Sequence, residues 1–88
     1  MSPAPCTFSA HAVIVLRERD IAPEWVMRVL QAPTRVETDR AESTLRHALG
    51  AIAEREGRIL RVIYRQSAHS RLIVTAFFDR AETRKRRS

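Results

Sequence analysis

The chain has 88 residues and a mass of 10.1 kDa, with 44% hydrophobic and 30% charged residues. A chain of this length supports one small domain, because two domains would each be too short to form a sufficient hydrophobic core. Its longest uninterrupted apolar run, 12–16, is far shorter than the roughly 20 residues that span a bilayer. With no secretory signal visible, we expect a cytoplasmic protein without a membrane segment. The single cysteine, Cys6, excludes an intramolecular disulfide and a cysteine-based zinc cluster.

The charge is strongly basic, with 16 Lys and Arg residues, 10 Asp and Glu residues and a net charge of +6. Four of the basic residues are consecutive: Arg84, Lys85, Arg86 and Arg87. Without these four, twelve basic residues face ten acidic residues, and the rest of the chain carries only +2. All basic residues except Lys85 are arginines, whose planar fork suits phosphate groups. The net positive charge predicts attraction to polyanions but does not identify the polyanion.

The N-terminal part of the chain predicts two helices after a loose leader, 1–6. Residues 7 and 8 suit a short strand, and Ser9 suits the N-cap of a helix that ends near residue 19. The β-branched run 13–15 would also suit a strand. Pro23 occupies a typical first helical position, and the apolar spacing of 25–30 predicts an amphipathic helix that ends before Pro33.

The second half of the chain predicts strands over 34–38, 58–66 and 71–78. Residues 44–53 fit either a helix or a strand, although an extended segment agrees better with the strands that follow. The expected fold class is therefore α+β, with two N-terminal helices packed on one face of a three- to four-stranded antiparallel sheet. Residues 1–83 would form a single domain, and 84–88 a basic, disordered tail.

Several short motifs occur in a familiar order. They are Phe8-Ser9-x-His11-Ala12, Arg19-Asp20-Ile21, Trp25-Val26, Gly57-Arg58-x-Leu60-Arg61-Val62 and Val74-Thr75-Ala76-Phe77-Phe78-Asp79-Arg80. Together they resemble a bacterial family known as domain of unknown function 4258, over roughly Phe8 to Arg80. Two departures are Asp20, where the family more often has glycine, and the arginine-rich tail. An Asp can still adopt the left-handed conformation that such a glycine supplies.

That family is similar in predicted fold to the RelE/ParE toxin superfamily. The resemblance implies a RelE-like fold and a toxin-type protein that binds RNA or the ribosome, in some members as a messenger-RNA endonuclease. The alternative is a non-catalytic binding module of the same fold that engages a partner protein, such as an antitoxin, or a second copy of itself. A fold alone does not decide between these functions.

Metal-independent RNA cleavage requires a base, an acid and positive donors for the phosphorane. Strand alternation places Leu60 and Val62 under the helices, so Arg61 and Arg65 should project from the open face of the sheet. His47 on the neighbouring segment could act as the acid or base. Because Arg80 follows the last strand, near where the superfamily carries its C-terminal catalytic residues, it could clamp a phosphate.

The candidate catalytic residues are therefore His47, Arg61 and Arg80. The candidate nucleic-acid-binding residues are Arg46, Arg65, Arg84, Lys85, Arg86 and Arg87. His11 is expected to have a structural role at the strand-to-helix corner, with a place in the site as the alternative. The competing interpretation pairs the arginines with carboxylates and makes the histidines ordinary half-buried residues. No metal-ligand spacing and no glycine-rich phosphate loop occur, so no cofactor is expected.

Overall fold

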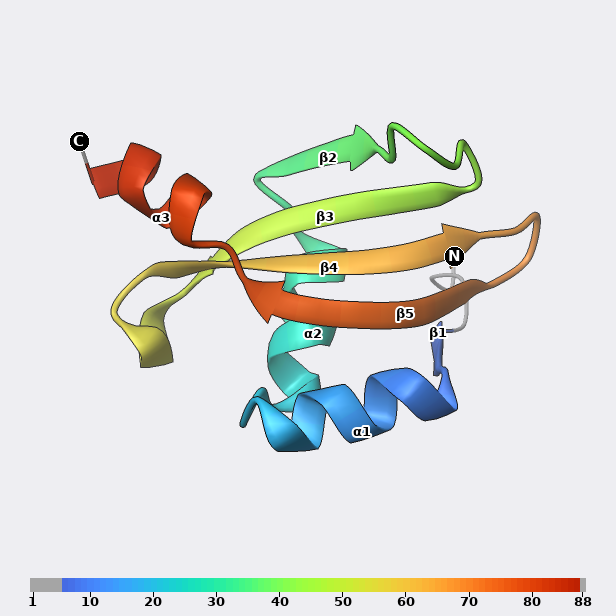
Figure 1. The fold of residues 1–88 in the computed structure, drawn as a ribbon, viewed down its shortest axis with the longest axis horizontal. Helices are drawn as coiled ribbons and strands as arrows, with labels where there is room; N and C mark the ends of the chain where they lie inside the picture. Colours follow the sequence, from blue (N-terminus) through green and yellow to red (C-terminus); the bar gives the residue numbers. More distant parts are fainter. Residues whose placement is uncertain (1–5, 88) are drawn as a thin grey trace.

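The computed structural model describes residues 6–87 and shows an α+β fold with five strands and three α-helices (Figure 1). In chain order the elements are β1 (Cys6–Phe8), α1 (Ala10–Glu18), α2 (Pro23–Gln31), β2 (Arg35–Thr38), β3 (Leu45–Ile52), a 3₁₀ turn (Ala53–Arg55), β4 (Arg58–Gln66), β5 (Arg71–Phe78) and α3 (Arg80–Arg87). The α+β class is as expected. The leader was expected over 1–6; Cys6 instead begins β1, and 1–5 lie outside the described residues.

The five strands form one mixed sheet in the order β1-β5-β4-β3-β2. Four of them form an antiparallel meander, and β1 adds to β5 in parallel. The prediction of a three- to four-stranded, purely antiparallel sheet was therefore wrong in size and type. Residues 45–52, left open between helix and strand, pair with β4 over their whole length.

Helices α1 and α2 cover one face of the sheet, as predicted, and bury the hydrophobic core (Figure 1). Ser9 caps α1 because its Oγ accepts a hydrogen bond from the N–H of Ala12 at 3.0 Å. Pro23 begins α2, and Asp20 between the helices has φ 55°, the left-handed conformation expected there. Between the helices and the sheet, Val26 of α2 and the strand residues Ile52, Leu60, Val62 and Ile73 are all almost completely buried.

A register shift in β5 changes which of its residues face the core. Ile63 pairs with Thr75 and the next residue, Tyr64, pairs with Ile73, so the pairing passes over Val74. Ile73 is consequently buried under the helices together with Ala76. Simple alternation along β5 would place these two residues on opposite faces, because they are three positions apart.

The C-terminal basic segment is the largest difference from expectation, because Arg80–Arg87 forms helix α3 instead of a disordered tail. Asp79 starts this helix: its Oδ1 accepts a hydrogen bond from the N–H of Glu82 at 3.0 Å, and its carbonyl accepts one from the N–H of Thr83. The helix packs against β4 at one end of the sheet (Figure 1). It lies on the face opposite α1 and α2, where Glu82 Oε1 is 4.0 Å from Arg61 Nη2. The helices are thus not all N-terminal. Within residues 6–87, none of them is long and apolar enough to cross a membrane.

Candidate functional site

The open face of the sheet carries a cluster of charged side chains centred on Arg61. The Nε of Arg61 donates to Asp79 Oδ2 at 2.8 Å, and its Nη1 donates to Glu37 Oε1 at 3.1 Å. Only 13% of the Arg61 side chain is exposed. Arg61 occupies the face that strand alternation predicts, but its guanidinium is neutralised by the carboxylates of Asp79 and Glu37.

His47 joins this cluster through both nitrogens of its ring. Arg61 Nη1 lies 2.9 Å from His47 Nδ1, and Asp39 Oδ1 lies 2.8 Å from His47 Nε2. Because a guanidinium can only donate, Nδ1 must be the acceptor and Nε2 must carry the proton that it donates to Asp39. The cluster therefore fixes one neutral tautomer of His47 and leaves neither nitrogen available for proton transfer in this arrangement.

The carboxylates of the cluster are held in their ionised form. Arg61 lowers the pKa of Glu37 through a hydrogen bond, and His47 does the same for Asp39. Burial opposes ionisation of Asp79, but hydrogen bonds from the N–H of Glu82 and from Arg61 lower its pKa overall. Burial likewise opposes the charge of Arg61, while its hydrogen bonds to Asp79 and Glu37 raise its pKa overall.

An open groove of about 630 Å³ runs beside this cluster along the β2 side of the sheet face. It is lined by Arg35, Glu37, Thr38, Asp39, Arg40, Ala41, His47, Arg61, Glu82 and Lys85. Basic and acidic side chains alternate around it, and Arg35 Nη2 lies 2.9 Å from both Glu37 Oε2 and Glu82 Oε1. The groove is therefore close to electrically balanced and is not a basic patch.

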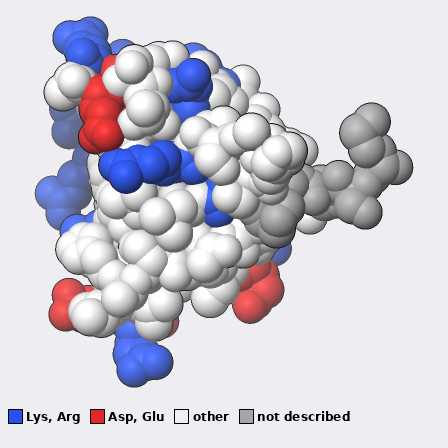
Figure 2. All heavy atoms as spheres, turned by 90° about the vertical axis from the view of Figure 1, so that its right-hand side faces the viewer, with Lys and Arg blue, Asp and Glu red and all other residues white. Residues whose placement is uncertain are grey.

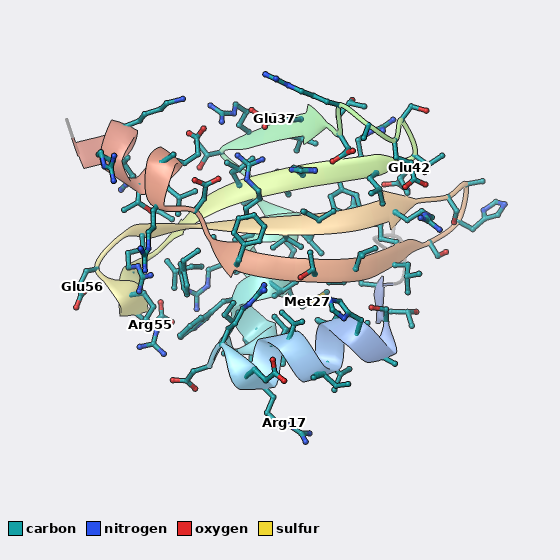
Figure 3. All side chains as sticks on the ribbon, in the orientation of Figure 1. Arg17, Met27, Glu37, Glu42, Arg55 and Glu56 are labelled. Atoms are coloured by element: carbon teal, nitrogen blue, oxygen red, sulfur yellow. The ribbon has the colours of Figure 1, made fainter. Side chains whose placement is uncertain are left out.

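Three other predicted residues lie outside the cluster. Arg65 is exposed on the same face and pairs with Glu42 at 3.1 Å. Glu42 lies in the β2–β3 loop (Figure 3). Arg46 shares the opposite face with Ala48 and donates to the backbone carbonyls of Ser43 and Leu45. His11 is exposed on α1.

At the strand-to-helix corner the hydrogen bonds come from Ser9, two residues before His11. Among the described residues the His11 side chain makes no hydrogen bond. Ser9 instead holds the strand-to-helix corner, where its N–H donates to the carbonyl of Ile73 at 3.0 Å.

Arg80 does not reach the Arg61 cluster but lines a hollow on the other side of α3. This hollow, about 280 Å³, is lined by Arg58, Phe78, Arg80, Thr83 and Arg84, and we call it the arginine hollow. Among the described residues, no carboxylate lies within ion-pair distance of Arg58, Arg80 or Arg84. Three arginines with uncompensated charge thus surround one concave site.

Stacked aromatic and guanidinium groups extend from the arginine hollow along the edge of the core. The guanidinium carbon of Arg58 lies 4.6 Å from the centre of the Phe78 ring, and Trp25 meets that ring edge-to-face at 6.3 Å. Arg55 covers Trp25 in turn at 5.2 Å. Arg58 and Phe78 were not among the predicted site residues. Their proximity follows from the strand register, because Phe78 pairs with Leu60, and Leu60 lies two residues after Arg58 on β4.

Lys85 of α3 lines the groove, on the other side of the helix from the arginine hollow. Lys85 Nζ lies 3.6 Å from Glu82 Oε1. Arg86 approaches Gly57 and borders a second hollow, of about 290 Å³, whose floor includes Leu49 and Ile59. The side chain of Arg87 lies outside the described part of the structure.

The opposite end of the molecule has a different surface. Figure 2 shows broad uncharged areas there, with acidic residues toward the edges and basic residues both at the edges and within the face. Arg55 and Glu56 lie instead at the β3–β4 turn, at the same end as α3 (Figure 3).

In the part of the chain from 6 to 87, no group of three or more His, Cys, Asp or Glu side chains could hold a metal ion.

Comparison with known proteins identifies the family to which the chain belongs. The model of a domain of unknown function, DUF4258, matches residues 8–78, which is most of the chain and agrees with the extent of the sequence motifs. No curated protein and no solved structure matches the chain. The match covers α1, α2 and β2–β5 and stops just before α3. The chain belongs to the DUF4258 family.

Proposed function

We propose that this protein binds RNA through the arginine hollow at the α3 end of the sheet. The observation that carries the proposal is the convergence of Arg58, Arg80 and Arg84 on one concave site whose lining, among the described residues, contains no carboxylate. The exposed arginines of the α3 surface can form paired hydrogen bonds with phosphate oxygens. The net charge of +6 adds a long-range attraction to the same polyanion.

The aromatic edge beside the hollow favours a single strand as the form of RNA. Single-stranded nucleic acids bind to positively charged surfaces that also offer aromatic or guanidinium planes for base stacking. Phe78, Trp25 and the arginines above them supply such planes next to the phosphate-binding groups. The RelE-like fold that the sequence motifs imply would make this a toxin-type RNA-binding protein, acting in the cytoplasm where messenger RNA and ribosomes occur.

Binding without cleavage is the form of this function that the geometry supports best. A metal-independent endonuclease requires free acid and base groups near the phosphate. Both nitrogens of His47 are engaged, Arg61 is bound by carboxylates, and Tyr64 is buried in the core. Arg80 also lies apart from His47, so the predicted catalytic residues do not converge on one phosphate.

The test is fluorescence anisotropy of a labelled single-stranded RNA with the full chain. The Arg80→Ala/Arg84→Ala variant should bind about tenfold more weakly or worse. The slope of the logarithm of its binding constant against the logarithm of the salt concentration should be smaller in magnitude by roughly one to two. The matched control, Arg17→Ala/Arg40→Ala, removes two exposed arginines elsewhere and should bind almost as the unmodified chain does. Equal losses in both variants, or no binding by the unmodified chain, would contradict the proposal.

A second measurement separates binding from cleavage. Messenger RNA incubated with the protein and ribosomes should remain intact, and expression of the protein should not arrest growth through loss of messenger RNA. Cleavage that disappears in His47→Ala and Arg61→Ala would overturn the non-catalytic form and assign those residues to an endonuclease site.

A further inference from the structure

Strand β2 is one edge of the sheet and pairs only with β3. Figure 1 shows no described element beyond it on its outer side. Edge strands present unpaired backbone groups to which another strand can add. We propose that two copies of this chain associate by antiparallel pairing of their β2 edges about a twofold axis at Val36.

The backbone geometry of β2 permits this register. The N–H of Asp39 donates to the carbonyl of Leu45 at 3.0 Å, and the strand register pairs Glu37 with His47. In an antiparallel pair, hydrogen-bonded residues alternate with residues whose backbone groups point outward. The backbone N–H and C=O of Val36 therefore point away from β3 and could pair with those of Val36 in a second copy.

The side chains of β2 match this twofold axis. The sequence Thr34-Arg35-Val36-Glu37-Thr38 reads symmetrically about Val36, with opposite charges on its two sides. Pairing at Val36 sets Arg35 of each copy directly across from Glu37 of the other. Opposite charges across neighbouring strands are stabilising, and like charges are destabilising.

The same charges disfavour the neighbouring registers. A twofold axis at Arg35 would oppose two arginines, and an axis at Glu37 would oppose two glutamates. Charges on an edge strand ordinarily discourage pairing with other chains. In this strand their order permits one register with a second copy and penalises the adjacent ones, which is the property that isologous association requires.

The exposed surface of β2 agrees with a contact. Val36 is a large apolar residue that is 47% exposed, and in the dimer it would pack against its own counterpart. The side chains of Arg35 and Glu37 are also nearly half exposed, so they can reach across the edge while they keep their partners Glu82 and Arg61. A four-residue edge is short, so the association should be weak and concentration-dependent.

Sedimentation velocity over a range of concentrations tests the proposal on the full chain. The unmodified protein should show a monomer–dimer equilibrium, and Val36→Lys should shift it to monomer by about tenfold or more in the dissociation constant. Ile14→Lys, at an exposed apolar position on α1, is the matched control and should dimerise as before. A chain that is monomeric at every concentration, or equal effects of the two variants, would overturn the proposal.

A mixing experiment tests the register itself. In a homodimer of Arg35→Glu, the facing positions 35 and 37 would both be glutamates; in a homodimer of Glu37→Arg, they would both be arginines. Each variant alone should therefore dimerise about tenfold more weakly or worse. An equimolar mixture should recover dimers, since every position 35 then faces an opposite charge at position 37. Thermal melts confirm that both variants are folded. A mixture that stays monomeric would overturn the register.

Discussion

Arg61 and Asp79 join the middle of the sheet to the first turn of helix α3. Arg61 Nε donates to Asp79 Oδ2 at 2.8 Å, while Asp79 Oδ1 accepts from the N–H of Glu82 in that turn. One carboxylate therefore caps the helix and fixes it against the sheet. Since Arg80 and Arg84 lie on this helix, the ion pair also holds the proposed RNA-binding residues in place.

Replacing Arg61 with Met should destabilise the protein by about 2 kcal/mol, because it removes the cation and leaves partly buried carboxylates without it. Replacing Arg65 with Met should change the free energy of unfolding by less than about 0.5 kcal/mol, because its pair with Glu42 is half exposed and screened. Urea denaturation measures both. Similar values for the two variants would show that the Arg61 cluster does not stabilise the fold.

Thr83 supplies the second anchor of α3 and is the single buried polar side chain found among the described residues. Its Oγ1 donates to the carbonyl of Asp79 at 2.7 Å and accepts from the N–H of Ile59 at 2.9 Å. Thr83→Val keeps the shape but leaves a buried N–H unpaired, so we expect a loss of about 1–3 kcal/mol. Thr83→Ser keeps the hydroxyl and should lose clearly less; hydrogen exchange at the Ile59 amide reports the difference directly.

The sequence could predict the parts of this structure that depend on local pattern. Alternation in β4 placed Leu60 and Arg61 on the correct faces, and the cap at Ser9 and the start at Pro23 follow from local chemistry. The β5 register shift at Val74 could not be foreseen, because it depends on how two strands fit together.

Helix α3 was missed for a different reason. Its signal, Asp79 followed three residues later by Glu82, resembles a helix-capping pattern, but the run of four basic residues after it indicated a disordered tail. The anchors at Arg61 and Ile59 come from distant parts of the chain. The same anchors bring Arg58 beside Arg80 and Arg84, which is why the arginine hollow was also missed.

Stability should fall in acid through the carboxyls of the Arg61 cluster. The pKa of Glu37 lies below its ordinary value of 4.5, and those of Asp39 and Asp79 lie below 3.8. A carboxyl with a lowered pKa in the folded state stabilises the protein above its ordinary pKa and loses that contribution as the pH falls through the lowered value. We therefore expect the melting temperature to be steady near neutral pH and to decrease below about pH 4.5.

Arg61→Met provides the control for this pH dependence. Without the guanidinium, the pKa values of Glu37 and Asp79 should return toward their ordinary values, because their main cationic partner is gone. The variant should be less stable at neutral pH and should lose less additional stability in acid. Parallel melting curves from neutral to acidic pH in the two proteins would contradict this assignment.

Gly50 of β3 lies directly against Val29 of α2. A Cβ at this position would lie 3.1 Å from Cγ2 of Val29, which is 98% buried and cannot move freely. Gly-to-Ala changes in an unstrained site stabilise a protein by about 0.4–1 kcal/mol through the unfolded chain, but here the helix must shift to admit the methyl group. We expect Gly50→Ala to lower the free energy of unfolding by about 1 kcal/mol by itself.

In a Val29→Ala background the contact is gone and the same change should become neutral or stabilising. A double-mutant cycle measured by urea denaturation should therefore give a favourable coupling between the two substitutions. Additive effects of the two substitutions would mean that the packing of α2 on β3 is looser than this contact indicates.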